Sequence, residues 1–443
     1  MAGSALRDEG VLEFLHVLEE LTRSEYDPQG PFQAAAYKVR RDGSGKRLVY
    51  FKVLSGVLQP RDTVRVHEEE EKVNELFQVM GSRLIPCRHA QAGDLIAVSG
   101  LKKAGCGTIL GEDFGKKRPI GSVPALEARV RAEDGTDSHR LLEVLKILED
   151  EEPELKAQSR KMADGSEQLC IQVMGAIQLE VLKEVIQKRF GILTAFSQPR
   201  VLYKETIGKP VMGYGHYEPL RHYAEVCLRL EPGEAGSGIT FESRCHVDDL
   251  AAHYQSLIRT HVFERVHRGI LTGSPLTDVK VILVAGRAHL KHTEGGDFRQ
   301  AVYRAIRQGL EKAENVLLEP WYDLEVAAPA QMAGRILAEM SKRFARLSPM
   351  EQYGEQAVIR GRGPVACFLD FPKELASMTK GEATLFAANA GYFPCHNGDE
   401  VIAGSGYNKD GDPEHTSASV FCSHGAGFSV PWDQVETYIH SRL

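Results

Sequence analysis

Hydrophobic residues follow two different periods in this chain, and the change between them near Val123 constrains its fold more than any single motif. From Phe32 to Gly111, short strand-like segments are separated by glycine and proline turns, a pattern that favours a small β-barrel. Beyond Val123, strand-like and helical segments alternate. With 443 residues, the chain is too long for one ordinary core, so we expect a multidomain α+β protein of about three or four domains.

The segment 120–198 has the order β-α-β-α-β. The strand-like ALEARVRA precedes a helical pattern with Ser138 as its N-cap. The strand-like EQLCIQVMG precedes a second helix that ends at Gly191, and ILTAFSQP closes the segment. With one short extra strand, this order fits a ferredoxin-like split β-α-β domain. The same order returns over 318–398, so we predict two similar domains of this kind.

Between these two segments, residues 199–317 are strand-rich and contain two strong helical patterns. The first begins near Leu250, has Val266 on its apolar face and ends at Gly269 as a predicted C-cap. Three histidines lie on or near it, at positions 253, 261 and 267. Their spacings of 8 and 6 residues do not suit a helical metal site, and we expect these side chains to face solvent.

The segment AGRAHLKHTEGGD, at 285–297, joins the strand DVKVILV to the second helical pattern. It carries an arginine, a lysine and two histidines within six positions, and Leu290 is its only large apolar residue. These side chains suit contacts with phosphates and base edges, and arginine and histidine also stack on unpaired bases. Gly286 and Gly295–Gly296 would let the backbone approach a partner closely. Composition alone favours the alternative, an ordinary connection with Asp297 as N-cap.

The composition limits the kinds of partner and compartment. The net charge of −7 means that nucleic-acid binding must depend on local basic clusters. No window approaches the ~18 apolar residues of a membrane span, and the first residues carry no apolar signal segment. The eight cysteines occur singly, which is typical of reduced thiols in a cytosolic protein. We therefore expect a cytoplasmic protein without a membrane partner.

No motif predicts catalysis or a metal site. GSGK at 43–46 looks like the end of a phosphate loop, but arginine stands at positions 40 and 47 where that motif needs glycine and a hydroxyl residue. We expect an exposed hairpin turn there. The pairs Cys395-His396 and Cys422-x-His424 match no common zinc spacing. We predict neither catalytic residues nor a metal ion for this chain.

Specific strings give this order of segments a family resemblance. YFKVLSGVLQPRDTV resembles the second domain of elongation factor G, and LEDEEPEL and VMGAIQLEVL resemble its third. RGILTGSPLTDVKVIL and the G-x-x-H of Gly286 to His289 resemble its fourth, and LLEPWYDLEVAAP and MTKGEATL its fifth. The resemblance implies a β-barrel translation-factor domain II at 30–119, a ferredoxin-like domain III at 120–198, a ribosomal-protein-S5-like α/β domain IV at 199–317, a ferredoxin-like domain V at 318–398 and a C-terminal extension at 399–443.

The N-terminus resembles the end of a GTPase domain. GSALRDEGV is similar to the last guanine-contacting motif of a translational GTPase, with Ser4, Ala5 and Leu6 as its residues, and the next helix resembles that domain's final helix. Residues 1–29 are therefore expected to be a remnant whose phosphate loop and switch regions lie upstream. The resemblance implies that this chain is no enzyme by itself and holds no cofactor, whereas the full-length protein would be a ribosome-stimulated GTPase using GTP and Mg²⁺.

The resemblance also implies a partner, the bacterial 70S ribosome. In this family the fourth domain is a lever whose tip reaches the decoding centre of the small subunit. The residues at the tip position of this chain are Gly286, Arg287, His289, Leu290, Lys291, His292 and Thr293. We expect them to contact small-subunit rRNA, with tRNA as a further partner, in a monomeric protein.

Three functions are compatible with this resemblance. GDFRQAVYRAIRQGLEKAENVLLEP and the C-terminal extension resemble the tetracycline ribosomal-protection proteins, which implies displacement of tetracycline by the tip. The tip nevertheless lacks the tyrosine pair and prolines of the best-known protection proteins, and GAIQLE stands where elongation factor G has an acidic residue and a histidine. The alternatives are an elongation factor G paralogue acting in translocation or ribosome recycling, and a stand-alone, non-enzymatic ribosome-binding module.

Overall fold

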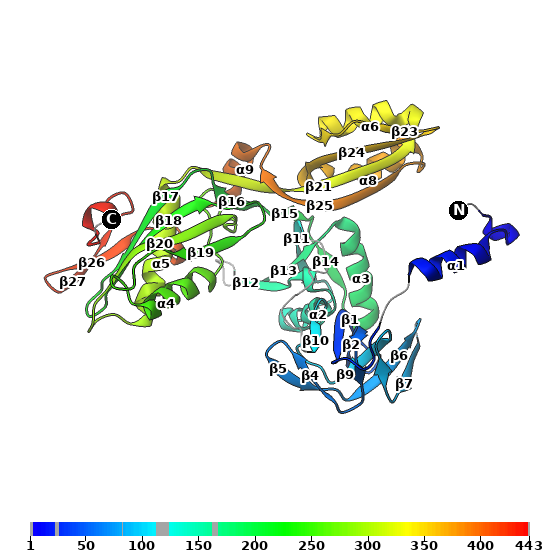
Figure 1. The fold of residues 1–443 in the computed structure, drawn as a ribbon. Coiled ribbons are helices and arrows are strands. Elements are labelled where there is room, and N and C mark those ends of the chain that lie inside the picture. The colour runs from blue at the N-terminus through cyan, green and yellow to red at the C-terminus, as the bar shows by residue number, and fades with distance from the viewer. Residues whose placement is uncertain (1–2, 23–25, 82, 112–123, 162–166, 442–443) are drawn as a thin grey trace. The chain divides into compact units, whose positions relative to one another are not determined.

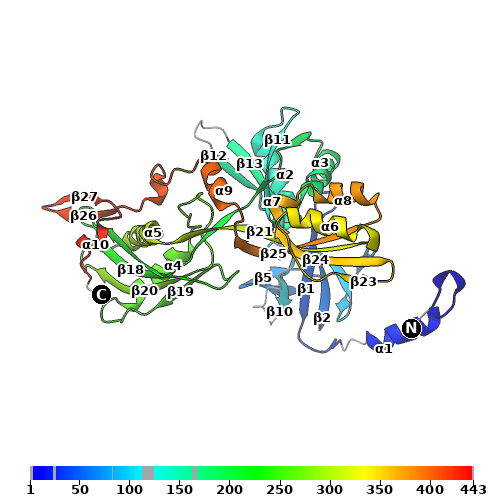
Figure 2. The same cartoon turned by 90° about the horizontal axis from the view of Figure 1, so that it is seen from above.

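The computed structural model describes residues 3–22, 26–81, 83–111, 124–161 and 167–441. These residues form two compact units (Figures 1 and 2). The first unit comprises Met1–Val123, Arg129–Gln172 and Glu180–Ser197, and the second comprises Pro124–Ala128, Val173–Leu179 and Gln198–Leu443. Sheets and helices alternate in the way that the sequence predicts, so the multidomain α+β class is confirmed. None of the helices in the described ranges combines the length and apolar composition needed to cross a bilayer.

The first unit begins with an exposed helix and an eight-stranded antiparallel sheet. The helix, α1 (Val11–Leu21), is amphipathic, yet none of its side chains is buried. The strands of the sheet are β1 (Gln33–Arg41), β2 (Arg47–Ser55), β4 (Thr63–Val66), β5 (Glu69–Lys72), β6 (Glu75–Met80), β7 (Arg83–Cys87), β9 (Leu95–Ser99) and β10 (Ile109–Gly111). A short pair, β3 (Val57–Leu58) and β8 (Ala90–Gln91), accompanies them.

The order of this sheet is β5-β4-β10-β1-β2-β9-β6-β7, and the strands can be followed in blue to cyan in Figure 1. Alternate residues of its strands point into one apolar core that includes Val39, Val49 and Phe51, as the period of two requires. Residues 43–46 form the turn between β1 and β2, closed by a hydrogen bond from the Gly45 amide to the Asp42 carbonyl. The prediction of a hairpin turn for GSGK is therefore confirmed.

The next domain has the ferredoxin-like order. Its elements are β11 (Leu126–Ala132), α2 (Ser138–Glu151), β12 (Gln158–Lys161), β13 (Glu167–Val173), α3 (Ala176–Phe190) and β14 (Thr194–Phe196), and β15 (Arg200–Val201) also pairs with β11. The sheet order is β12-β13-β11-β14, and β12 is the short extra strand. Asp137, not Ser138, is the N-cap of α2 because its extended backbone leaves Ser138 as the first helical residue. Gly191 ends α3 with a φ of +73°. The residues around the expected boundary at 119–120 lie outside the described ranges.

A buried carboxylate joins this domain to the β-barrel within the first unit. Glu151, at the end of α2, has a fully buried side chain that accepts hydrogen bonds from Arg40 of β1 at 2.7 Å and from both terminal nitrogens of Arg189 of α3 at 2.7 and 2.8 Å. Burial alone would raise the pKa of Glu151, but these two guanidinium groups hold it below its usual range. The ion pairs therefore offset the cost of burying the charge.

The segment expected to be domain IV forms a further sheet together with two strands of the C-terminal segment, and two helices cover one face of it. Its strands are β17 (Val211–Tyr217), β18 (Ala224–Pro232), β19 (Ile239–Ser243), β20 (Val279–Ala288), β26 (Ser419–Ser423) and β27 (Ala426–Val430), in the order β19-β20-β18-β17-β26-β27. The helices are α4 (Ala252–Phe263) and α5 (Gly295–Lys312). Both helices bury residues such as Ile258 and Phe298 in one core with Val226 and Val281 of the strands.

The predictions for the first of these helices were partly wrong. It ends at Phe263, with Glu264 as C-cap, so it does not reach Gly269, and Val266 is 66% exposed. His261 and His267 do not face solvent but are buried. Because the chain leaves the helix after Glu264, His267 folds back and its Nε2 lies 2.9 Å from the carbonyl oxygen of Val262. Burial lowers the pKa of His267 to about 4.

Domain V repeats the ferredoxin-like order. Its elements are β21 (Asn315–Pro329), α6 (Ala330–Lys342), β22 (Arg346–Leu347), β23 (Glu351–Tyr353), β24 (Gln356–Pro364), α7 (Val365–Phe368), α8 (Phe371–Thr379) and β25 (Thr384–Pro394). β21 pairs with β24 and β25, and its first residues also pair with β16 (Lys204–Ile207). One strand therefore runs through the expected boundary between residues 317 and 318.

The last segment returns to domain IV. After α9 (Gly398–Ser405), β26 pairs in parallel with β17 at Tyr217 and Val420. A short terminal helix, α10 (Val435–Tyr438), follows β27. It packs with Tyr214 and Phe421 on the face of the sheet that α4 and α5 do not cover.

We predict that Glu151→Ala destabilises the first unit by about 2–3 kcal/mol, because two guanidinium groups lose their carboxylate partner. The value lies below the ~3–5 kcal/mol of a fully buried pair because Arg40 and Arg189 are partly exposed. The measurement is the shift of the first unfolding transition in calorimetry. Glu149→Ala is the matched control, since Glu149 pairs with Lys146 near the surface, and it should change stability by less than about 0.5 kcal/mol. Equal effects of the two variants would contradict the prediction.

Candidate nucleic-acid interface

The predicted cationic segment forms the connection between β20 and α5. The backbone leaves β20 after Ala288 and enters α5 at Gly295. Arg287, the last residue but one of β20, is exposed, and the connection exposes the side chains of His289, Leu290, Lys291, His292 and Glu294. Leu290 is completely exposed. The structure therefore brings six of the seven predicted tip residues, including Thr293, together at the end of β20 and on the loop that follows it, which we call the tip.

Hydrogen bonds within the tip hold its backbone. The Thr293 hydroxyl accepts from the His289 amide at 2.7 Å and donates to the Tyr223 carbonyl at 2.6 Å. The Tyr223 amide donates to the carbonyl of His292 at 3.0 Å, and the Thr293 amide donates to that of His289 at 3.0 Å. The imidazole rings of His289 and His292 stack with centroids 4.6 Å apart. The tip is thus a closed turn that is hydrogen-bonded to Tyr223, the residue before β18. Its charged side chains remain exposed.

Two residues of the segment have roles other than those predicted. Gly286 lies inside β20, opposite Val226, and is buried. A Cβ atom there would come within 2.8 Å of Leu250, so this glycine serves the packing of the sheet and cannot contact a partner. Asp297 is not the N-cap of α5. Glu294 is the N-cap, and the Asp297 carboxylate accepts from its amide at 2.9 Å in a capping box.

A loop that the sequence did not single out lies beside the tip. The hairpin between β17 and β18 carries Leu220, Arg221 and His222. Leu220 is 64% exposed, and the Nδ1 of His222 lies 2.9 Å from the Asp297 carboxylate. Arg244 follows β19, which runs parallel to β20 but ends opposite Leu283, five residues before the end of β20, so it lies farther from the tip. An arginine-histidine pair after a proline, as in EPLRHY, is a weak signal that could have drawn attention to the hairpin.

The C-terminal segment contacts the residues that hold the tip in place. The fully buried Glu225 of β18 accepts hydrogen bonds from the amides of His440 at 2.9 Å and Ser441 at 2.7 Å, and lies 2.9 Å from Nδ1 of His216. Burial would raise the pKa of Glu225, but these hydrogen bonds lower it to about 2. The hydroxyl of Tyr223 lies 3.1 Å from Nδ1 of His440. Tyr223 therefore connects the tip with the C-terminal segment.

This arrangement suits binding to a polyanion more than catalysis. Arg287, Lys291 and Arg221 supply exposed permanent charges for phosphate oxygens. The stacked histidines and the exposed Leu290 offer flat and apolar surfaces for an unpaired base. The predicted guanine-contacting residues lie in the other unit: Ser4 precedes a short turn of 3₁₀ helix, Ala5–Arg7, in which Leu6 is 98% exposed.

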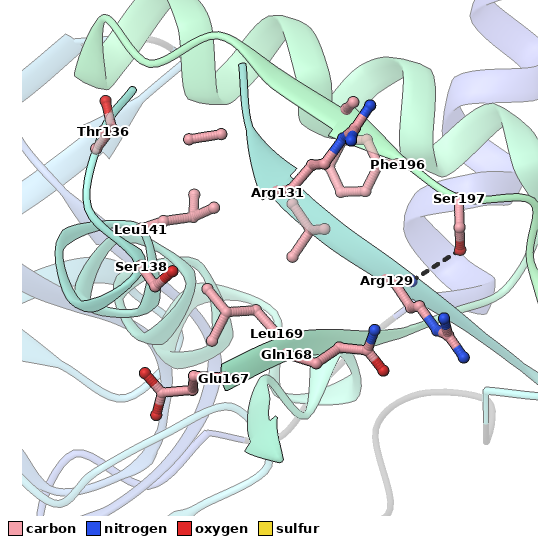
Figure 3. A pocket seen from close by; sticks show the side chains of 13 residues that line it. Arg129, Arg131, Thr136, Ser138, Leu141, Glu167, Gln168, Leu169, Phe196 and Ser197 are labelled. Carbon is pink, nitrogen blue, oxygen red and sulfur yellow. Dashed lines mark hydrogen bonds between the residues drawn. The ribbon is translucent and has the colours of Figure 1, made fainter. Parts of the chain in front are cut away.

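A cavity of about 520 Å³ lies in the first unit, on the ferredoxin-like domain (Figure 3). Arg129, Arg131 and Phe196 line it, and the Arg129 amide donates to the Ser197 hydroxyl at 3.0 Å. Its hydroxyl groups belong to serine and threonine side chains, but its lining contains no histidine, lysine or cysteine. The lining therefore offers no serine–histidine or cysteine–histidine pair, and we base no activity on this cavity.

Comparisons with known proteins agree on one family. Residues 31–110 match elongation factor G domain 2, residues 199–314 match elongation factor G domain IV, and residues 316–400 match the elongation factor G C-terminus. The chain is 29% identical over 383 residues to elongation factor G 2 of Streptomyces coelicolor, covering 83% of this chain and 55% of that protein. A crystal structure of a Thermus thermophilus protein superposes with a TM-score of 0.52 at 28% identity, over 90% of this chain and 62% of the other. The chain thus spans little more than half the length of these relatives.

We predict that Glu225→Gln releases the C-terminal segment from the sheet, because an amide cannot accept all three hydrogen bonds and places its NH₂ group against a donor. Hydrogen exchange of the amides of His440 and Ser441 should accelerate at least about tenfold, since losing one such bond costs roughly 1.5–3 kcal/mol. The matched control is Glu436→Gln, whose exposed carboxylate lies 3.4 Å from Lys312. Unchanged exchange at His440 and Ser441 in the Glu225 variant would overturn the prediction.

Proposed function

Because this chain belongs to the elongation factor G family, we propose that it binds the bacterial ribosome and that the tip of domain IV contacts small-subunit rRNA at the decoding centre. The observation that supports this role most directly is the tip itself. Its cations are exposed, whereas its backbone is held by Thr293 and Tyr223. A loop that is ordered before binding loses less conformational entropy than a free loop.

The charge distribution supports a local contact. The whole chain carries a net charge of −7, so a general attraction to RNA is not expected. At the tip, Arg287 and Lys291 gain from rRNA phosphates at short range, and the gain is screened within a distance of about 8–10 Å at physiological salt. The affinity should therefore depend on these few positions and fall as salt rises.

The proposal extends to the whole protein. With GTP and Mg²⁺ bound to a GTPase domain, the full-length protein would hydrolyse GTP on the ribosome, and residues 1–29 would be the end of that domain. Domains III, IV and V would span 120–198, 199–317 and 318–398, with a C-terminal extension at 399–443. The protein would act as a monomer in the cytoplasm, and tRNA would be a further contact of the tip.

Two activities fit this location on the ribosome. The first is displacement of tetracycline, favoured by the C-terminal segment that packs behind the tip through Glu225 and by the sequence likeness of 296–320 to the protection proteins. The second is translocation or ribosome recycling, favoured by the match to a protein named elongation factor G 2. Both activities use the tip at the decoding centre, and they differ in whether the tip must compete with the drug.

For the tip, we predict that replacing Arg287, His289, Lys291 and His292 together with alanine weakens binding to 70S ribosomes by at least about tenfold at low salt. The slope of log K against log salt should fall by about 1–2, because two permanent charges are lost. Binding is measured by co-sedimentation at several salt concentrations.

A double variant, Lys209→Ala and Arg259→Ala, is the matched control. Both residues are exposed cations of the same domain, and Lys209 precedes β17 at the end of the strand remote from the hairpin with β18. Circular dichroism of both variants checks the fold. An unchanged affinity and slope for the quadruple variant would refute the role of the tip.

To separate the two activities, we predict that the complete gene, expressed in a tetracycline-sensitive bacterium, raises the tetracycline concentration that stops growth. The quadruple tip variant should lose this gain, because it cannot compete with the drug. No gain from the wild-type gene, together with normal ribosome binding, would favour the paralogue activity.

A further inference from the structure

Three chemically different side chains converge where domain V meets the C-terminal segment. Cys395 and His396 lie in the turn between β25 and α9, and Glu319 lies in β21. Strand pairing brings them together, since Leu318 is opposite Pro394 and the Cys395 amide donates to the Leu317 carbonyl at 2.9 Å. One ligand atom from each of the three side chains lies within 4.8 Å of the other two.

The carboxylate of this group is fixed in place. The Glu319 side chain is fully buried. Its Oε1 accepts from the Trp321 indole at 3.2 Å and from the His396 amide at 2.9 Å, and Nδ1 of His396 lies 2.8 Å from Oε1 and 3.0 Å from Oε2. The imidazole is 13% exposed, so solvent reaches part of the ring.

The second ring nitrogen of His396, Nε2, also has a partner. Cys367 lies in α7, directly after β24, and its Sγ is 3.5 Å from Nε2 of His396. The Phe344 ring packs on the imidazole with centroids 4.6 Å apart. A histidine that binds a metal through one nitrogen commonly donates its other N–H to a neighbouring acceptor, which fixes the orientation of the ring. Cys367 and Phe344 provide this support.

We propose that Glu319, Cys395 and His396 form a binding site for a divalent zinc ion. One thiolate, one imidazole nitrogen and one carboxylate oxygen are the three ligand types that Zn²⁺ takes in tetrahedral sites, and the fourth position is left for water or a neighbouring group. One thiolate and one carboxylate also balance the two charges of the ion.

The site is distinct from a second group of donors in the described ranges, His216, Glu225 and His440. There, both oxygens of Glu225 accept backbone amides. Both ring nitrogens of His216 already lie within 3.1 Å of a carboxylate, those of Glu225 and Glu218. The hydrogen bond between His396 and Glu319 would likewise give way to a metal, but this second group contains no cysteine, and its His216 and Glu225 side chains are fully buried. We assign that group to docking of the C-terminal segment.

Binding at the proposed site exchanges a proton for the metal. Burial, with a contribution from the charge of Glu319, raises the pKa of the Cys395 thiol to about 11. At neutral pH the S–H bond must therefore break as the S–Zn bond forms, and the proton passes to solvent.

The site would connect the C-terminal segment to domain V. The turn that holds Cys395 and His396 leads directly into α9, and Glu319 belongs to the longest strand of the domain, β21. A bound ion would close this turn onto the sheet. It would thereby stabilise the folded domain, because a ligand that binds only the folded state shifts the unfolding equilibrium. This inference does not rest on the proposed ribosome binding.

The test is metal titration of the full chain after removal of bound metal with a chelator. Co²⁺ replaces Zn²⁺ as a coloured probe, and we expect one Co²⁺ per chain, with a near-ultraviolet sulfur-to-cobalt charge-transfer band that Zn²⁺ abolishes. Zn²⁺ should also raise the Tm. Cys395→Ser should lose the band, and Glu319→Gln and His396→Ala should each weaken Co²⁺ binding at least about tenfold. Cys367→Ala should keep the band but weaken binding about tenfold, as expected for the loss of an orienting neighbour.

Cys422→Ser is the matched control, because Cys422 is also partly buried and unpaired in a disulfide but lies in β26, away from the site. It should bind Co²⁺ like the wild-type chain. Circular dichroism without metal shows whether each variant folds. The wild-type titration decides the question even if Cys395→Ser does not fold, since no band and no change in Tm at equimolar Co²⁺ would overturn the proposal. A band that persists in folded Cys395→Ser would overturn it as well.

Discussion

The position of the tip depends on the close packing of α5 on its sheet. At Gly213 and Gly215 of β17, a Cβ atom would lie 2.2 and 1.9 Å from carbonyl oxygens of α5, far inside van der Waals contact. Any side chain at either position would push the helix away from the sheet, because protein interiors leave no spare volume. The two glycines let α5 bury Phe298 and Val302 on the strands. They thereby place the first turn of α5, and the connection that enters it, beside the start of β18.

Tyr223 then holds the tip in place through hydrogen bonds. Its amide and carbonyl hold His292 and Thr293, and its hydroxyl contacts His440. Backbone groups near the charged loop are therefore satisfied inside the domain, while Arg287 and Lys291 remain exposed. The affinity for a polyanion then depends on exposed charge, and the geometry depends on buried hydrogen bonds. The two properties reside in different residues, so they can be changed separately.

Much of the fold was predictable because the hydrophobic period reports which face of an element is buried. The main barrel strands and both ferredoxin-like domains follow from it, and Gly191 ends α3 as expected. The errors lie where neighbours in space override the local pattern. The apolar period continues to Val266, but the helix ends at Phe263 and His267 folds back under it. Gly286, which suggested close approach to a partner, is small because Leu250 packs against it.

The sequence by itself determined the type of each domain and the cationic character of the tip, since both depend on residues that are neighbours along the chain. Only the tertiary structure decided which distant residues act together. Ser419 bonds to a residue 203 positions earlier in β17, and His396 meets Glu319 from 77 positions away. Such contacts depend on strand register and on the order of strands in a sheet. A register shift of one residue would turn each side chain to the opposite face, and no local pattern specifies that register between distant strands.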